Sequence, residues 1–195
     1  MEVVMLSTKR LKMTPKTQIR ASRKLSLVLR HKPEAIGLEL DARGWADVKS
    51  LLRKMSASGT NLTLADLEEI VAQNDKKRFA FSPDGRKIRA SQGHSIDVDL
   101  QLESLTPPAK LFHGTATTSV DSILATGLQS RSRQHVHLSL DLETATKVGA
   151  RHGKPVILTI DAAAMHAAGY KFYCSANNVW LTNEVPKEYI YKVGW

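Results

Sequence analysis

The side chains through which this chain could do chemistry are arginines and histidines rather than paired carboxylates. Arg30 and His31 are adjacent. A guanidinium binds phosphate through two parallel hydrogen bonds, and an imidazole gives or takes a proton near neutral pH. Taken alone, the pair is better explained as two solvated residues that close a helix, where positive charge suits the helix dipole.

Three further places could contribute to the same site. Arg78 stands beside Phe79, and Arg133 lies in a short polar run. As isolated residues, Arg78 is equally compatible with a surface charge, and a surface charge is the better explanation of Arg133. His113-Gly114-Thr115 ends a short strand candidate, where polar groups could approach a ligand closely or simply form a turn.

Metal, nucleotide and glycosidase motifs are weak or missing. His135 and His137 share one face of a predicted strand, but no neighbouring carboxylate or cysteine completes a metal site, so we expect no metal. Neither a Gly-x-Gly-x-x-Gly fingerprint nor a Walker loop is present. The acidic residues after position 105 lie mostly near predicted helix starts or turns, which disfavours a glycosidase-type carboxylate pair.

The elements that must position these residues begin with helices and a hairpin. Apolar periodicity predicts three helices, over residues 16–31, through residues 45–55 and from Thr63 onward. Pro33 ends the first helix near His31. Alternating apolar residues flank Ser82-Pro83-Asp84-Gly85, which predicts a hairpin over 79–90. Three helices and a hairpin suggest a winged helix, a common carrier of nucleic-acid contacts, although fold alone does not establish function.

A second lobe is predicted beyond a boundary near residue 105. Residues 95–109 are expected to form a last strand and then a linker, with His94 packed at the lobe junction. The following strand candidates are Lys110–His113, His135–Leu140, Pro155–Ile160, Phe172–Cys174, Val179–Thr182 and Tyr189–Val193. Residues 117–126 and 142–150 are helix candidates. The predicted fold class is therefore α+β, in two lobes.

Charge favours a polyanionic partner. The 195 residues have a net charge of +9, and residues 1–33 hold nine basic side chains and one acidic one, nearly the whole excess. Phosphate contacts would explain this, and so would a solubilising tail or a solvated helix face. The single cysteine excludes an internal disulfide, and no apolar run suggests a signal peptide or membrane span. We therefore expect a cytoplasmic protein without membrane contact, and nothing demands more than a monomer.

Eight short stretches, in order, resemble the RNA 2′-phosphotransferase (tRNA 2′-phosphotransferase) family. They are Leu-Ser-Leu-Val-Leu-Arg-His-Lys-Pro at 25–33, Gly-Trp-Ala-Asp-Val at 44–48, Lys-Arg-Phe at 77–79, Ile-Arg-Ala-Ser-Gln-Gly-His-Ser-Ile at 88–96, Leu-Phe-His-Gly-Thr at 111–115, Arg-Gln-His-Val-His-Leu-Ser at 133–139, Arg-His-Gly-Lys-Pro-Val at 151–156 and Asn-Val-Trp-Leu-Thr at 178–182. Each is weak alone, but together they span about residues 20–190 and leave positions 1–15 outside.

The resemblance implies an organisation and a reaction. After a basic extension (1–15), it implies a winged-helix RNA-binding lobe (16–104) and an ADP-ribosyltransferase-like α/β lobe (105–195) that binds NAD⁺. The implied reaction moves an internal RNA 2′-phosphate, as at a tRNA splice junction, to NAD⁺ through an ADP-ribosylated intermediate. Its products are RNA with a free 2′-hydroxyl, nicotinamide and ADP-ribose 1″,2″-cyclic phosphate.

The resemblance also assigns site residues. The implied catalytic residues are Arg30, His31, Arg78 and Arg133. The implied NAD⁺-binding residues are His113, Gly114, Thr115, His137, Ser139 and Val179. The arginines would bind the 2′-phosphate and neutralise its charge. His31 would transfer the proton in the transesterification step that releases the RNA 2′-oxygen. Val179 stands where many relatives in the wider class carry a catalytic glutamate, and Phe112 stands where the family usually shows tyrosine.

Two other functions use the same residues. One is an ADP-ribosyltransferase that caps terminal phosphates of nucleic acid and stops after one step. The other is an RNA-binding protein with an inactive transferase lobe. That function predicts that another residue replaces His113, His137 or Arg133, but all three are present in this chain.

Overall fold

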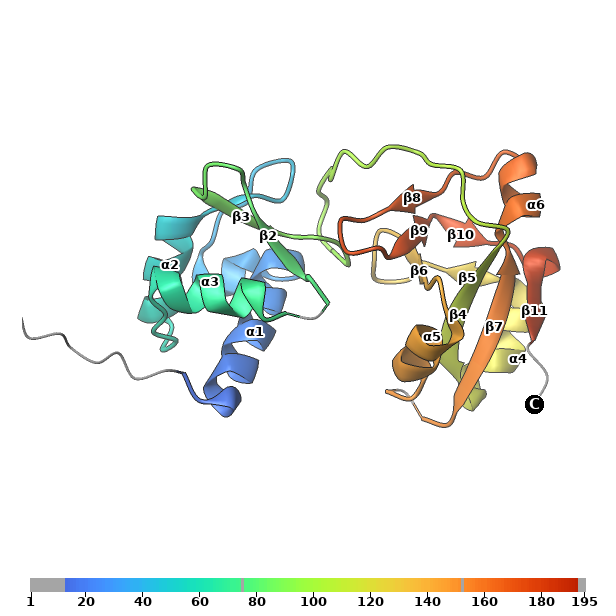
Figure 1. Cartoon of the computed structure of the whole chain (residues 1–195), viewed down its shortest axis with the longest axis horizontal. Helices are drawn as coiled ribbons and strands as arrows, with labels where there is room; N and C mark the ends of the chain where they lie inside the picture. The colour runs from blue at the N-terminus through green and yellow to red at the C-terminus, as the bar shows by residue number, and fades with distance from the viewer. Residues whose placement is uncertain (1–12, 75, 152, 193–195) are drawn as a thin grey trace, which may run out of the picture.

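The computed structural model describes residues 13–192 apart from 75 and 152, and it forms two lobes side by side (Figure 1). One cluster of buried hydrophobic side chains lies within residues 21–90 and a second within residues 111–190. We call residues 13–90 the N-terminal lobe, residues 91–109 the connector and residues 110–192 the C-terminal lobe. Positions 1–12 of the predicted basic extension lie outside the described residues.

The N-terminal lobe consists of three α-helices, one short 3₁₀ helix and a small sheet. Its helices are α1 (Pro15–Arg30), η1 (Pro33–Ile36), α2 (Val48–Ala57) and α3 (Leu64–Ala72). The strands β1 (Ala46–Asp47), β2 (Phe79–Phe81) and β3 (Lys87–Ala90) pair antiparallel in the order β1-β3-β2. The three predicted helices and the hairpin are confirmed. The second helix begins at Val48 rather than Trp45 because Asp47 caps it, accepting a hydrogen bond from the amide of Ser50 at 2.7 Å.

The C-terminal lobe is built from short antiparallel sheets with helices packed on them (Figure 1). Its strands are β4 (Lys110–Ala116), β5 (Leu128–Gln129), β6 (Val136–Leu138), β7 (Pro155–Asp161), β8 (Tyr173–Cys174), β9 (Trp180–Thr182), β10 (Glu184–Val185) and β11 (Ile190–Lys192). Its helices are α4 (Thr117–Thr126), α5 (Leu142–Gly149), α6 (Ala162–Ala167) and η2 (Lys187–Tyr189). The sheet orders are β11-β7-β4, β6-β9-β8 and β10-β5.

The joint between β4 and β6 brings the two larger sheets together. The amide of Ser139 donates to the carbonyl of Phe112 at 2.7 Å, and the amide of Phe112 donates back at 2.9 Å. On its other side β4 packs so closely on α5 that a Cβ at Gly114 would lie 1.7 Å from the carbonyl oxygen of Ala145. Gly114 is therefore a packing requirement of the β4–α5 contact.

The strand predicted after residue 95 is wrong. Residues 95–103 form no strand, since the chain bends at Ser95 and Ile96 and Gln101 has a φ of +54°, and the connector reaches a sheet at a bridge between Ser104 and Tyr173. The reason is that loops of both lobes take its hydrogen bonds. The amide of Asp99 donates to the carbonyl of Ala42 at 2.8 Å, and the side-chain amide of Gln134 donates to the carbonyl of Val98 at 2.9 Å.

The other predicted elements of the C-terminal lobe are confirmed, most of them within two residues, and β4 extends three residues beyond the predicted end at His113; β5, β10, α6 and η2 were not predicted. The overall class is mixed helix and antiparallel sheet, α+β, as predicted. Among the residues described, no helix is long and apolar enough to cross a membrane.

Candidate functional site

Arg30 and His31 reach the junction of the lobes because α1 ends there. Apolar side chains hold one face of α1 in the core, and Pro33 opens the next element, so the helix cannot continue. The carbonyl of Arg30 accepts a hydrogen bond from the amide of Ser95 at 3.0 Å. The last turn of α1 is thereby tied to the connector.

The Arg30 guanidinium contacts Arg78 and Phe79 at the start of β2. Its Nη2 donates to the carbonyl of Arg78 at 3.4 Å, and its carbon lies 6.0 Å from the centre of the Phe79 ring. Its Nε is buried and has no hydrogen-bond partner in the part of the chain that the structure describes. Burial, followed by the charges of Arg78 and Arg133, lowers the pKa of Arg30 to about 10. The group stays cationic at neutral pH, and a bound anion would relieve both its desolvation and the repulsion.

The His31 ring is oriented by the connector. Its Nδ1 lies 2.9 Å from the Oγ of Ser95. Burial lowers the pKa of His31 below its ordinary value, and the charges of Arg30 and Arg133 lower it further. Without an anion in the site, His31 is therefore neutral at pH 7.

Arg78 and Arg133 come from different lobes. Arg78 directly precedes β2, and its carbonyl accepts from the amide of Ser91 at 2.9 Å. Arg133 lies in the turn before β6 and is exposed. Both charges act on Arg30, so the three guanidinium groups share one neighbourhood. In the described part of the chain, none of the three is in an ion pair with a carboxylate.

The hydrogen bonds of His137 settle its tautomer. Arginine can only donate, so the Nδ1 of His137 accepts from the Nη1 of Arg133 at 3.3 Å. The proton therefore sits on Nε2, which donates to the Oε1 of Gln92 at 2.8 Å. Burial, and next the charge of Arg133, lower the pKa of His137 to about 3. His137 is a neutral imidazole held between Arg133 of the C-terminal lobe and Gln92 of the connector.

His113 lies beside His137 on the neighbouring strand. Its Nδ1 donates to the carbonyl of His137 at 3.1 Å. Thr115 shares a strand face with His113 because side chains alternate along β4. The Leu138–Trp180 pair of β6 and β9 places Val179 opposite Ser139 at the end of the ladder. The residues predicted to bind NAD⁺ thus lie on β4, on β6 and the residue after it, and directly before β9.

The connector residues Gln92–Ser95 contact both groups of predicted residues, and sequence reasoning did not select them for the site. Gln92 bonds His137, and Ser95 bonds His31. Gly93 has a φ of +86°, and a Cβ there would lie 3.7 Å from Arg30 Nη1 and 3.8 Å from His137 Nε2. The sequence signal that could have identified this segment is Gly93 among polar residues, because a side chain at this position would occupy space between the lobes.

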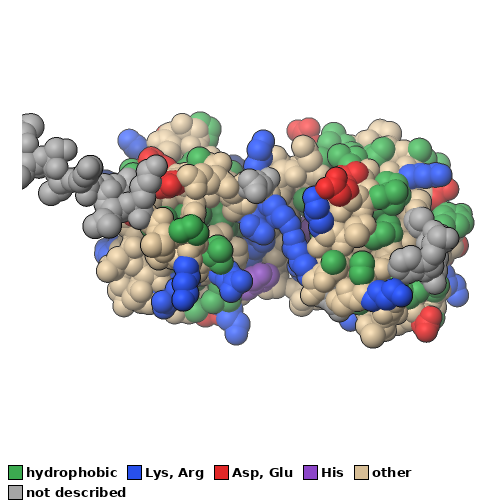
Figure 2. All heavy atoms as spheres, turned by 60° about the horizontal axis from the view of Figure 1, so that its bottom comes forward, with side chains coloured by type: hydrophobic (Ala, Val, Ile, Leu, Met, Phe, Trp, Pro, Cys, Tyr) green, Lys and Arg blue, Asp and Glu red, His purple; other side chains and the backbone are tan. Residues whose placement is uncertain are grey.

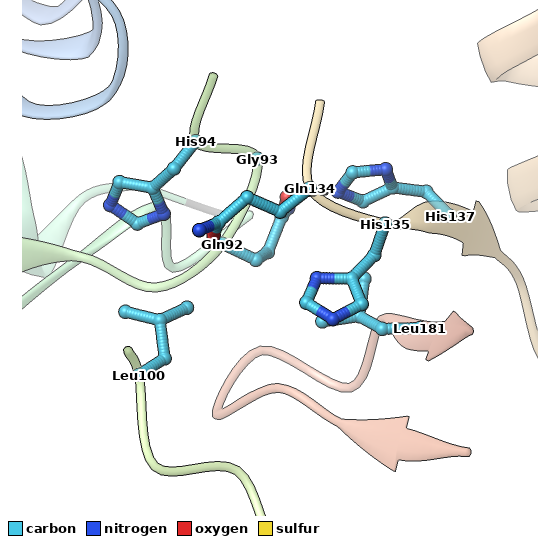
Figure 3. Close-up of a pocket in the computed structure, with 8 residues that line it drawn as sticks. All are labelled: Gln92, Gly93, His94, Leu100, Gln134, His135, His137 and Leu181. Carbon is cyan, nitrogen blue, oxygen red and sulfur yellow. Dashed lines mark hydrogen bonds between the residues drawn. The ribbon is translucent and has the colours of Figure 1, made fainter. Parts of the chain in front are cut away.

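His94 lies buried at the lobe junction, as expected (Figure 3). It is 1% exposed, neither ring nitrogen has a hydrogen-bond partner among the residues described, and its carbonyl accepts from the amide of Gln134 at 3.1 Å. Burial first, then the charges of Arg30 and His31, lower the pKa of His94 to about 4. It packs behind the site as a neutral imidazole.

Two cavities lie beside the connector. A cavity of about 10 Å³ lies beside Gln92, His94 and His137, and a second of about 160 Å³ beside Asp99, His135 and Tyr173. None of the four catalytic candidates lines either cavity. Figure 2 shows Lys and Arg side chains gathered where the lobes meet. Within the described ranges, no three His, Cys, Asp or Glu side chains come together to hold a metal ion.

Comparison with known proteins assigns the family. A family model described as "RNA 2'-phosphotransferase, Tpt1 / KptA family" matches residues 16–184. Among similar curated proteins, one from Hahella chejuensis is 63% identical over 87% of this chain and 91% of its own length. One from Nostoc punctiforme is 53% identical over 90% of this chain and 97% of its own, and one from Agrobacterium fabrum is 57% identical over 87% and 91%. All three are named probable RNA 2'-phosphotransferase. The protein therefore belongs to the RNA 2′-phosphotransferase family.

Proposed function

We propose that this protein removes an internal 2′-phosphate from RNA in an NAD⁺-dependent reaction. The observation that carries the proposal is the convergence of Arg30, Arg78 and Arg133, which have no carboxylate partner among the described residues, beside His113 and the neutral imidazole of His137. Such a site binds a phosphoryl group and stabilises charge that develops on it. A phosphate dianion is already a nucleophile, so it needs aiming rather than a general base.

The donor set fits NAD⁺. Nicotinamide is cationic when bound to ribose, and the uncharged His137 adds no repulsion to it. Thr115 and Ser139 offer hydroxyl groups to a ribose, and Val179 in place of a carboxylate leaves no base to activate an outside acceptor. NAD⁺ would supply the electrophilic ribose carbon. His113, Gly114, Thr115, His137, Ser139 and Val179 are the residues that would hold it.

The arginines and His31 have different roles toward the 2′-phosphate. Arg30, Arg78 and Arg133 would hold the 2′-phosphate and neutralise its charge. A bound dianion offsets the arginine charges that lower the pKa of His31, so the substrate itself favours a protonated imidazole. With Nδ1–H donating to Ser95, the Nε2–H of His31 would be left to protonate the departing RNA 2′-oxygen.

The N-terminal lobe would bind the RNA. Its three helices followed by a hairpin match the element order of a winged helix. The basic surface at the lobe junction would attract phosphates, with an affinity that weakens as salt rises (Figure 2).

The test is an incubation of the protein with a short RNA bearing one internal 2′-phosphate, with and without NAD⁺, followed by mass analysis. We expect NAD⁺-dependent loss of the phosphate mass and appearance of ADP-ribose cyclic phosphate. RNA that gains an ADP-ribose mass and keeps its phosphate would support the one-step transferase instead. Unchanged RNA would refute the proposed removal of the 2′-phosphate, and a second RNA with a terminal phosphate would then separate terminal capping, seen as an added ADP-ribose mass, from RNA binding alone.

A further inference from the structure

Gln92 lies in a short segment of the connector that is bonded to the N-terminal lobe on both sides of it. The amide of Ser91 donates to the carbonyl of Arg78 at 2.9 Å, and the amide of Ser95 donates to the carbonyl of Arg30 at 3.0 Å. The segment is therefore fixed to the backbone of the two N-terminal-lobe residues whose guanidinium groups belong to the candidate site.

Arg133, from the other lobe, reaches this segment through a histidine. Its Nη1 donates to the Nδ1 of His137 at 3.3 Å, and the Nε2 of His137 lies 2.8 Å from the Oε1 of Gln92. Among the described residues, the bond to His137 is the only hydrogen bond that the Arg133 side chain makes. Because that side chain is otherwise exposed, its orientation depends on His137.

The three bonding groups allow a single arrangement of protons. A guanidinium only donates, so Arg133 requires the lone pair of His137 Nδ1. A neutral imidazole then carries its proton on Nε2, and that N–H requires an acceptor. Gln92 supplies the acceptor with its carbonyl oxygen. A side chain at position 92 that cannot accept leaves the N–H without this partner and removes a contact that orients the imidazole ring.

We propose that Gln92 is a positioning residue, which orients the Arg133 guanidinium for the RNA 2′-phosphate through the imidazole of His137. The inference rests on the proposed function, in which Arg133 holds that phosphate. It gives His137 a second role besides contact with NAD⁺. Because the segment that carries Gln92 is also bonded to the backbone of Arg30 and Arg78, this chain of hydrogen bonds places the third arginine relative to the other two.

The test measures how much the 2′-phosphate contributes to RNA binding by the full-length protein without NAD⁺. Two short single-stranded RNAs of one sequence are compared, one with an internal 2′-phosphate and one with a 2′-hydroxyl at the same position. The ratio of their Kd values is the phosphate preference. Gln92→Met keeps the approximate size of the side chain and removes the acceptor. We expect it to lower the phosphate preference roughly five-fold, the order of one hydrogen bond.

The matched control is Gln134→Met. The side-chain amide of Gln134 also joins the C-terminal lobe to the connector, by donating to the carbonyl of Val98 at 2.9 Å, and that bond involves neither His137 nor Arg133. A change that merely loosens the junction should act alike in the two variants. The positioning role predicts a lower phosphate preference in Gln92→Met alone.

Combined substitutions identify the path. Once Arg133→Ala has removed the guanidinium, Gln92→Met should lower the phosphate preference no further, because the two residues act in one chain. His137→Phe should lower the preference by a similar factor even though NAD⁺ is absent. Adding Gln92→Met to His137→Phe should then have no further effect.

Nitrogen NMR of the imidazole rings reports on the hydrogen bond itself. The signals of His137 are those that disappear in the His137→Phe variant. In the wild type at pH 7.5, Nε2 should carry the proton and Nδ1 should be unprotonated. Gln92→Met should move the Nε2–H signal and speed its exchange with water, whereas Gln134→Met should leave both unchanged.

Four results would overturn the proposal. They are an unchanged phosphate preference in Gln92→Met, an equal loss in Gln134→Met, a full additional loss when Gln92→Met is combined with Arg133→Ala, and a wild-type His137 that carries its proton on Nδ1.

Failure of the proposed function has a different signature. Equal affinity of the wild type for the two RNAs would refute the proposed phosphate site, and the role of Gln92 with it. An intact phosphate preference without products in the mass assay would refute the reaction alone.

Discussion

His94 makes the stability of this protein depend on pH in a way that a single substitution tests. Its imidazole is 1% exposed, and its pKa is lowered from 6.5 to about 4. In the unfolded chain the same group takes up a proton below about pH 6.5. The unfolded state therefore binds more protons between about pH 6.5 and 4, and the free energy of unfolding falls as the pH falls through that window.

The size of the effect follows from the two pKa values. At pH 7.5 both states hold a neutral imidazole and His94 contributes almost nothing. At pH 5.0 protonation stabilises the unfolded state by about 2 kcal/mol relative to the native state. His137 should add a similar loss, since its pKa is lowered to about 3.

The substitution His94→Leu isolates the first contribution. It removes the titrating group, and the carbonyl of residue 94 can still accept from the amide of Gln134. Urea unfolding at pH 7.5 and 5.0, followed by both tryptophan fluorescence and circular dichroism, measures the free energy of unfolding. Coincident curves from the two probes would show that the lobes unfold together.

We expect wild type to lose about 2 kcal/mol more than His94→Leu between pH 7.5 and 5.0. His94→Met serves as a second apolar variant in case leucine packs poorly. If wild type and both variants lose the same free energy over this range, the neutral buried imidazole is not what makes the protein acid-sensitive.

Three further predictions concern the site and its support. Arg133→Ala should slow turnover of 2′-phosphorylated RNA by about a hundred-fold or more, with an unchanged melting temperature; the neighbouring exposed Arg131→Ala is the control, and equal rates in the two variants would contradict the assignment. His31→Ala should yield RNA that carries an added ADP-ribose mass and retains its phosphate, whereas a simple loss of RNA binding would argue against its role in proton transfer. Gly114→Ala should cost about 3 kcal/mol or more because its Cβ meets a backbone oxygen. The control Gly59→Ala, at a position with open space, should lower the free energy of unfolding by about 1 kcal/mol because of its left-handed φ alone. Comparable melting temperatures of the Gly114→Ala and Gly59→Ala variants would contradict the close β4–α5 contact.

Local signals in the sequence were enough to predict most elements. The hairpin followed from its turn residues, and the end of α1 followed from Pro33. The prediction of a strand in the connector failed because the alternation of Ile96, Val98 and Leu100 is typical of a strand. The hydrogen-bond partners of the connector backbone instead come from loops of both lobes. No local pattern indicates such long-range partners.

The site itself could not be assembled from local patterns. Arg30, Arg78 and Arg133 are far apart in the chain, and each alone resembles a surface charge. Only the family resemblance grouped them, and the structure then brought their charges together. Gln92 and Ser95 were missed because an amide and a hydroxyl reveal their roles only when their histidine partners are placed beside them.

The connector also limits how the two lobes can be exchanged between relatives. A chimera joined at residue 105 would keep Gln92 and His94 with the N-terminal lobe, but their partners His137 and Gln134 would come from the other parent. The tautomer of His137 would then depend on a residue inherited separately from it. The unit of exchange is therefore the N-terminal lobe and connector together with the turn and strand at 133–138, rather than either lobe alone.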